Sequence, residues 1–333
     1  MKRIIELIKK YLHYWMVVSI ILGLANVYYF GGFSIPKELV VFLVVFLVIF
    51  PAMINTKFEE VFAHLKEPRP IFCSLFLNFV LSPFIAFILS KIFLSNQPQL
   101  FSALILLSLV PTSAMSAAWT SFSDAKMATA LYLIPTNLLF AAFVGLPFIL
   151  PIFIQDIMAV GKMSIIKTIL LVFIIPLILG DFTRRVITRV KGYEFFNNRI
   201  KPNLGGAGSV GILILVFLIM SLKRNTVLLH KLDRMAVMIP PVILYYVILY
   251  LISTAWAWFL IRSQALPGEK TVVIIYTSVA RHINISLALI LSSFPMEQSS
   301  SMILLLIVAY IIQVPSLAFF AQNFGKRIVN FGK

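Results

Sequence analysis

The stretch Thr271–Phe294, TVVIIYTSVARHINISLALILSSF, decides the fold class of this chain. Its 24 residues have the length and apolarity of a membrane-spanning helix, and only Arg281 and His282, near its centre, can carry a charge. A charged side chain at the centre of a bilayer costs at least ~2.5–3.5 kcal/mol, so it normally faces a protein interior or a wet cavity. Four further polar residues lie in the same stretch: Thr277, Ser278, Asn284 and Ser286. The stretch therefore predicts one wall of a polar site inside a membrane protein.

The composition of the whole chain agrees with this interpretation. Of its 333 residues, 61% are hydrophobic and 12% are charged, whereas soluble domains carry about 25% charged residues. We therefore expect an all-α polytopic integral membrane protein, with the lipid bilayer as its surroundings. The net charge of +16 is explained by basic residues in cytoplasmic loops, so nucleic acid is not an expected partner. Cys73 is the single cysteine, which excludes an intramolecular disulfide.

The apolar runs divide into ten expected transmembrane helices, at about residues 13–33, 39–55, 70–94, 99–123, 127–153, 163–183, 207–222, 236–261, 271–294 and 300–322. Residues 1–12 are basic and amphipathic, which is typical of a segment lying at the cytoplasmic headgroups. The longest expected loop, about 184–206, mixes basic and aromatic residues, which is typical of a cytoplasmic surface near anionic lipid.

The spacing of the expected helices nearly repeats. Helices two to five and helices seven to ten begin at positions that are 168, 166, 172 and 173 residues apart. Because each half holds an odd number of spans, the second half must insert upside down, which gives the inverted repeat common in secondary transporters. The predicted organisation is a cytoplasmic N-terminus (1–12), a first five-helix repeat (13–154), a connecting loop (155–162), a second repeat (163–323) and a cytoplasmic tail (324–333).

The fourth helix of each half carries a signal for interruption. Pro111-Thr112-Ser113 lies in the fourth expected helix of the chain, and Thr277–Arg281 lies in the ninth. Proline removes a backbone donor and clashes with the carbonyl four residues back. Backbone groups freed at membrane depth must be satisfied by protein or by water in a cavity. We therefore expect helices four and nine to be broken and to cross, with their ends contributing partial charges to one site.

Several motifs resemble one family. The segment PAMINTKFEEVFAHLKEPRPIFCSLFLNFVLSPF (51–84) is similar to the second-to-third-helix segment of arsenical-resistance (arsenite) permeases, a branch of the bile acid/sodium symporter superfamily. PTSAMSAAW (111–119), followed by Asn137, resembles the family's fourth and fifth helices. LGDFTRRVITRVKGYEFFNNRIKP (179–202) resembles its central cytoplasmic loop, and TSVARHINISLAL (277–289) resembles its second crossover helix. The resemblance covers roughly residues 13–322.

This resemblance implies ten helices in two inverted repeats, with a core of helices 3–5 and 8–10 and a panel of helices 1, 2, 6 and 7. Five positions differ from the pattern. The cysteine that arsenite permeases place in the fourth helix is Thr112 here, and the glutamate of their ninth helix is Asn284. The sodium-coordinating glutamate of the bile-acid branch is Thr277, and its Gln-Asn pair is Arg281-His282. A thiolate binds trivalent arsenic well, whereas a hydroxyl does not.

The candidate substrate- or ion-binding residues are polar groups in the expected helices: Arg281, His282, Asn284, Thr277, Ser278, Thr112, Ser113, Ser116, Asn137 and Asn78. All twelve carboxylates lie in expected loops or near helix ends, so the site is positive or neutral. Arg281 fits two roles, recognition of an anion by its planar fork or a structural role at helix-end carbonyls. His282 fits proton coupling or neutral packing. The hydroxyls and amides fit substrate contacts or bonds within their own helices.

The expected function is a secondary active transporter of this superfamily, arsenite-permease-like, working by alternating access at the crossover. The alternative is an organic-anion carrier (bile-acid-like or carboxylate) coupled to Na⁺ or H⁺. The sequence contains no Walker, HExxH or GxSxG motif and no cluster of metal ligands, so we expect no enzymatic activity, cofactor or metal. A membrane enzyme or a channel is a distant alternative. The expected partners are the bilayer of the plasma membrane and a small-molecule or ion substrate.

The distribution of basic residues predicts the orientation. The segments expected to be cytoplasmic hold 19 Lys and Arg residues, the outer segments hold eight, and Arg281 lies in the membrane. We expect both termini in the cytoplasm. Green fluorescent protein fused after Lys333 should therefore fluoresce, and alkaline phosphatase fused at the same point should be inactive. An active phosphatase fusion would contradict the five-plus-five arrangement.

Overall fold

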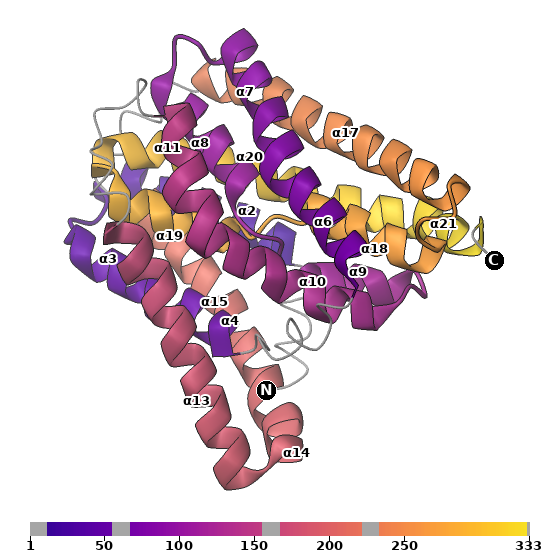
Figure 1. The fold of residues 1–333 in the computed structure, drawn as a ribbon. Helices are drawn as coiled ribbons and strands as arrows, with labels where there is room; N and C mark the ends of the chain where they lie inside the picture. Colours follow the sequence, from indigo (N-terminus) through magenta and orange to yellow (C-terminus); the bar gives the residue numbers. More distant parts are fainter. Residues whose placement is uncertain (1–11, 55–66, 155–166, 222–232, 332–333) are drawn as a thin grey trace. The chain divides into compact units, whose positions relative to one another are not determined.

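The computed structural model describes residues 12–54, 67–154, 167–221 and 233–331 (Figure 1). These residues are mostly helical and contain no strand, and an isolated antiparallel bridge joins Thr112 to Arg281. Four of the described helical runs are long and apolar enough to cross a membrane: Pro68–Phe93, Met127–Ile154, Ala236–Arg262 and Gln298–Phe331. The fold therefore fits the predicted all-α polytopic membrane protein. The predicted N-terminal segment, apart from its last residue, and the connecting loop 155–162 lie outside the described residues.

The chain divides into two compact units. Unit 1 comprises Met1–Thr56, Val160–Met235 and Leu287–Leu304, and unit 2 comprises Lys57–Ala159, Ala236–Ser286 and Leu305–Lys333. This division resembles the panel and core that the family pattern implies, except that residues 287–304 join unit 1. The boundary falls inside three helices, α17 (Asp233–Arg262), α19 (Ile283–Ser293) and α20 (Met296–Phe320).

Two helix pairs form the framework of unit 1. Its described helical segments are α2 (Leu12–Phe30), α3 (Lys37–Val44), η1 (Val45–Ile49), α4 (Phe50–Ile54), η4 (Leu170–Ile174), α13 (Ile175–Lys191), α14 (Tyr193–Phe195), η5 (Phe196–Ile200) and α15 (Lys201–Met220), together with the parts of α17, α19 and α20 that fall within 233–235 and 287–304. Helix α2 packs on α15, and α4 packs on α13. A glycine permits each close approach, because a Cβ at Gly23 would lie 2.6 Å from Met220 Cβ, and one at Gly180 would lie 2.7 Å from Met53 Cβ. Small residues commonly allow such contacts between membrane helices.

The prediction of a long loop at 184–206 is wrong. Helix α13 continues to Lys191, turns at Gly192 and is followed by helical segments up to Met220. Gly192 has φ +84°, a conformation that favours glycine and ends the helix. The basic segment therefore forms the end of one helix and the start of the next instead of a loop.

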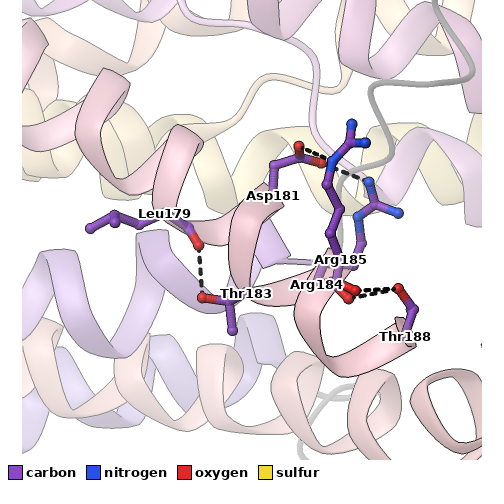
Figure 2. A network of polar contacts seen from close by, with 6 residues as sticks. All are labelled: Leu179, Asp181, Thr183, Arg184, Arg185 and Thr188. Carbon is purple, nitrogen blue, oxygen red and sulfur yellow. Dashed lines mark hydrogen bonds and ion pairs between the residues drawn. The ribbon is translucent and has the colours of Figure 1, made fainter. Parts of the chain in front are cut away.

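Hydrogen bonds along α13 explain why the polar end of that helix stays helical (Figure 2). The Asp181 carboxylate accepts a bond of 2.6 Å from Arg184 Nη2 and one of 2.7 Å from Arg185 Nε. The i,i+4 pair with the exposed Arg185 contributes about 0.2–0.5 kcal/mol to the helix, whereas Arg184, in the i,i+3 pair, is buried. The Thr188 hydroxyl donates to the Arg184 carbonyl oxygen at 2.9 Å, so it bonds its own helix.

Unit 2 contains the remaining described helices. They are α6 (Pro68–Phe76), η2 (Leu77–Leu81), α7 (Ser82–Phe93), α8 (Pro98–Leu109), α9 (Met115–Phe122), α10 (Met127–Phe140), η3 (Ala141–Ile149), α11 (Leu150–Ile154), most of α17 (Asp233–Arg262), α18 (Gly268–Val279), the first part of α19 up to Ser286, the second part of α20 from Leu305, η7 (Ala321–Gly325) and α21 (Lys326–Phe331). Helix α18 packs against α6, α9, α10 and α21. It is buried over almost its whole length, which makes it the central helix of this unit.

Most prolines inside the apolar runs do not break their helices. Five wide π-helical turns, η1 to η5, each end two residues before a proline: Pro51, Pro83, Pro151, Pro176 and Pro202. In each, the residue before the proline donates its N–H to the carbonyl five residues back instead of four. The wider turn gives the ring room beside the carbonyl with which it would clash. A proline alone therefore does not locate a broken helix in this chain.

Gly325 provides a test of the packing around α18. A Cβ at this position would overlap the hydroxyls of Tyr276 and Ser123, which hydrogen-bond each other. We expect Gly325→Ala to destabilise the protein by about 1–3 kcal/mol, as overpacked sites do, and to lower the melting temperature in detergent. Gly208→Ala, in α15, is the matched control because a Cβ there meets nothing within 4 Å. Equal melting temperatures for the two variants would show that the contact is not tight.

Candidate functional site

Both helices expected to be broken are broken. Helix α8 ends at Leu109, Val110 is extended with ψ 150°, and α9 begins at Met115. Helix α18 ends at Val279, Ala280 leaves the helical region with ψ 86°, and α19 begins at Ile283. The interruptions coincide with Pro111–Ser113 and closely follow Thr277, as the sequence predicts.

The two breaks are joined to each other by their backbones. Ser113 N donates to the Ala280 carbonyl oxygen at 2.6 Å, and His282 N donates to the Pro111 carbonyl oxygen at 2.9 Å. The Thr112 hydroxyl adds a third bond, to the Ala280 carbonyl oxygen at 3.2 Å. This short antiparallel bridge satisfies backbone groups that the ends of the helices leave open. Residues from distant parts of the chain are thereby held at one buried point.

Gln313, in α20, holds the backbone of Arg281 on both sides. Its Oε1 accepts from Arg281 N at 2.9 Å, and its Nε2 donates to the Arg281 carbonyl oxygen at 3.2 Å. The Tyr246 hydroxyl, from α17, also donates to Gln313 Oε1, at 3.0 Å. Gln313 is completely buried. Sequence reasoning missed it, although a glutamine two residues before Pro315 in an apolar run was a signal that could have found it.

Neutral polar side chains form a second buried cluster beside α18. Asn78 Nδ2 donates to Asn137 Oδ1 at 2.7 Å and to the Thr277 carbonyl oxygen at 3.3 Å. Asn137 Nδ2 donates to Ser74 Oγ at 2.9 Å, and the Ser74 and Thr277 hydroxyls lie 3.3 Å apart. Three predicted site residues thus meet here, together with Ser74, which the sequence did not single out. Asn78 Oδ1 is buried and has no hydrogen-bond partner among the described residues.

The other predicted hydroxyls bond within their own helix or turn. Ser278 Oγ donates to the Ile274 carbonyl oxygen at 2.7 Å, and Ser116 Oγ donates to the Ser113 carbonyl oxygen at 2.8 Å. Ser113 Oγ accepts from Met115 N at 3.3 Å. Such local bonds are common for Ser and Thr in membrane helices. They give these residues a local structural role at the breaks.

Three predicted residues lie at or just after the bridge. Arg281 forms it with Thr112, His282 is the next residue, and Asn284 lies two residues beyond His282. Arg281 is only 1% exposed, and its Nη1 donates to the Val110 carbonyl oxygen at 3.4 Å. His282 is buried, and its Nδ1 has no hydrogen-bond partner among the described residues. Asn284, by contrast, is partly exposed. Arg281 therefore places a buried guanidinium at the bridge.

Ion pairs join the ends of the helices outside the apolar core of unit 2. Lys270 Nζ lies 2.6 Å from Glu67 Oε2, Lys326 Nζ lies 2.9 Å from Asp124 Oδ2, and Lys126 Nζ lies 3.6 Å from Glu269 Oε1. The hydrogen bond from Lys270 lowers the pKa of Glu67 below its usual value. This pair therefore contributes stability above the ordinary pKa of glutamate, and the contribution is lost as the pH falls through the lowered pKa.

Apolar helices long enough to span a membrane, together with two broken helices joined at buried polar groups, define a class of protein. They are typical of membrane transporters that bind a solute between interrupted helices. The pattern of the sodium bile acid symporter family matches residues 42–231, more than half of the chain. The chain belongs to this family of membrane transporters.

Two relatives are arsenical-resistance proteins. The protein Acr3 of Corynebacterium glutamicum is 23% identical over 321 residues, which cover 90% of this chain and 84% of the relative. Acr3 of Alkaliphilus metalliredigens is 22% identical and covers 78% of each chain. An uncharacterized transporter of Synechocystis is also 22% identical, over 71% of this chain and 69% of its own. The resemblance to the arsenical-resistance branch of the family is confirmed.

Gln313 provides a test of the joint, which comprises the bridge between Thr112 and Arg281 and the bonds from Gln313 to the Arg281 backbone. Gln313→Leu would leave the Arg281 N–H and carbonyl and the Tyr246 hydroxyl without a partner, at a cost of about 1–3 kcal/mol for each group left unpaired. We expect a clearly lower melting temperature in detergent. Gln322→Leu, at an exposed position further along the same helical run, is the matched control. If both variants melt like the unmodified protein, Gln313 does not hold the joint.

Proposed function

We propose that this chain is a secondary active transporter of the plasma membrane that works by alternating access at the bridge between α8–α9 and α18–α19. Its ten transmembrane helices form two inverted repeats, at 13–154 and 163–323, and both termini are cytoplasmic. The single observation that carries the proposal is the backbone bridge between Thr112 and Arg281, because it joins two interrupted helices at a buried polar point.

The register of the two halves supports the inverted repeat. Helices α8 and α18 are both 12 residues long and begin 170 positions apart, at Pro98 and Gly268. The bridge residues Thr112 and Arg281 are 169 positions apart. Both separations agree with the 166 to 173 positions between the expected helix starts. Nearly the same offset thus relates α8 to α18 and Thr112 to Arg281.

Contacts between side chains follow the same relationship. Asn78 and Asn137 bond between the third and fifth expected helices, and Tyr246 and Gln313 bond between the eighth and tenth. Tyr246 lies 168 positions after Asn78, and Gln313 lies 176 positions after Asn137. In unit 1, the first expected helix packs on the seventh and the second packs on the sixth. Exchanging the two halves converts the pairing of helices one and seven into the pairing of helices six and two.

Two substrate classes are consistent with this proposal. The names of two relatives favour arsenous acid, the neutral form of arsenite at neutral pH. A buried arginine, and a threonine at the position that corresponds to the arsenite permeases' cysteine, favour an organic anion. Coupling to Na⁺ would rest on neutral oxygens such as those of Asn78 and Thr277, and coupling to H⁺ would rest on His282.

Flux assays in proteoliposomes test the proposal. We expect saturable flux of either arsenous acid or an organic anion such as benzoate or cholate, driven by a Na⁺ gradient or a pH gradient that is imposed separately. Thr112→Cys should strengthen arsenous acid transport, because it supplies a thiolate at the bridge, and Thr120→Cys, a buried threonine in α9 away from the bridge, should not. Flux that does not saturate and ignores both gradients would indicate a channel and contradict the carrier.

A further inference from the structure

We infer, on the basis of the proposed carrier function, that Arg281 is the anchor of the substrate and that the substrate is an anion with two neighbouring oxygen acceptors. A carboxylate or a tetrahedral oxyanion has this chemistry. The inference rests on three observations: the unused hydrogen-bonding edge of the Arg281 guanidinium, the pairing of the described carboxylates of unit 2 with lysines, and the bonding of the joint by other groups.

The guanidinium of Arg281 is buried with most of its hydrogen-bonding capacity unused. Its Nη1 makes one long contact of 3.4 Å, with the Val110 carbonyl oxygen, while Nε and Nη2 have no partner among the described residues. Arginine stays protonated in proteins, so it does not escape the burial by losing its charge. An unpaired buried charge is strongly unfavourable. A group kept in this state is suited to a ligand that is absent from the protein itself.

The two unpaired nitrogens share one edge of the guanidinium plane. On this edge the N–H groups of Nε and Nη2 are parallel, and their spacing matches that of two oxygens on one carboxylate or oxyanion. Arsenous acid also has neighbouring oxygens that could accept from both N–H groups, but it is neutral and would leave the buried charge uncompensated. The charge of Arg281, more than the shape of its edge, therefore favours an anion over neutral arsenous acid.

No carboxylate of the described part of unit 2 is available to Arg281. Those carboxylates belong to Glu67, Asp124 and Glu269, and each is paired with a lysine at a helix end. Arg281 forms no ion pair with any described residue. The described residues thus place a positive charge at the bridge and pair it with no negative charge of their own.

The structural role open to Arg281 is already filled by other groups. Gln313 bonds both the N–H and the carbonyl oxygen of Arg281. In the bridge, the Ser113 N–H bonds the Ala280 carbonyl oxygen, and the His282 N–H bonds the Pro111 carbonyl oxygen. Among the described residues, removing the guanidinium would therefore remove only the long hydrogen bond of 3.4 Å to the Val110 carbonyl oxygen. This separates the backbone of Arg281, which holds the joint, from its side chain, which does not.

The first experiment measures the stability of the purified protein in detergent without ligand. Because its charge is buried and unpaired, we expect Arg281→Met to melt at the same temperature as the unmodified protein or higher. Arg327→Gln, at an exposed position, controls for the loss of one arginine. If Arg281→Met lowers the melting temperature as much as Gln313→Leu does, Arg281 is structural and the inference is overturned.

The second experiment measures stabilisation by ligands, since a ligand that binds the folded state raises its melting temperature. The anions are sodium arsenate, sulfate, benzoate and cholate, and the neutral probes are arsenous acid and benzamide. We expect at least one of the four anions to stabilise the unmodified protein, while arsenous acid and benzamide do not. Arg281→Gln should weaken that binding by at least about 30-fold, as loss of one partner of a buried charge pair does. Arg281→Lys, which keeps the charge without the fork, should lie between.

Several results would overturn the inference: stabilisation by no anion of the set, anion binding that survives Arg281→Gln, or stabilisation by arsenous acid alone. Flux in proteoliposomes separates this failure from that of the carrier. Arsenous acid transport that is equal in the unmodified protein and Arg281→Gln would leave the carrier standing and remove the anion. Anion binding that depends on Arg281, without any flux, would leave the anion site standing and remove the carrier.

Discussion

The polar backbone of a broken helix must find partners within the protein when water is excluded, and unit 2 is organised around this requirement. Each unsatisfied N–H or carbonyl would cost several kcal/mol in an apolar environment. The breaks after α8 and α18 satisfy each other through the bonds of Ser113 and His282, and Gln313 completes the second break. The wide turns before prolines elsewhere solve a smaller problem, because there the helix continues and each N–H still has a carbonyl to bond.

The same requirement explains why most polar residues near the breaks are already engaged. Thr112 bonds the opposite break, and Ser116 and Ser278 bond their own helix or turn. Asn78 and Asn137 join three helices through a neutral network, in which each bond contributes roughly 1 kcal/mol. A substrate entering this region would compete with bonds that the fold needs. The side chain of Arg281 differs, because two of its donors have no partner in the described structure.

The sequence predicted the fold class, the positions of both breaks and the presence of Arg281 at the second break. These rest on long apolar runs and on the contrast between them and a few polar residues. It did not predict Gln313 or Ser74, because runs that are apolar on all sides carry no periodic signal for the face that a helix turns towards its neighbours. Nor did it predict that α13 continues to Lys191, because hydropathy marks the end of an apolar run and not the end of a helix. Asp181, Arg184 and Arg185 favour helix by local ion pairs that a hydropathy pattern does not measure.

The departures from the family pattern change the charge of the site more than its scaffold. Relative to the residues that the resemblance implies, Thr277 and Asn284 each stand in place of a carboxylate, and Arg281 stands in place of a neutral side chain. Both kinds of change make the bridge more positive, while the backbone bonds that hold it do not depend on those side chains. Cations are held by oxygens and carboxylates, whereas a fixed guanidinium repels them. A fold can keep its broken helices and change the sign of the solute that suits them, because function belongs to the site and not to the fold.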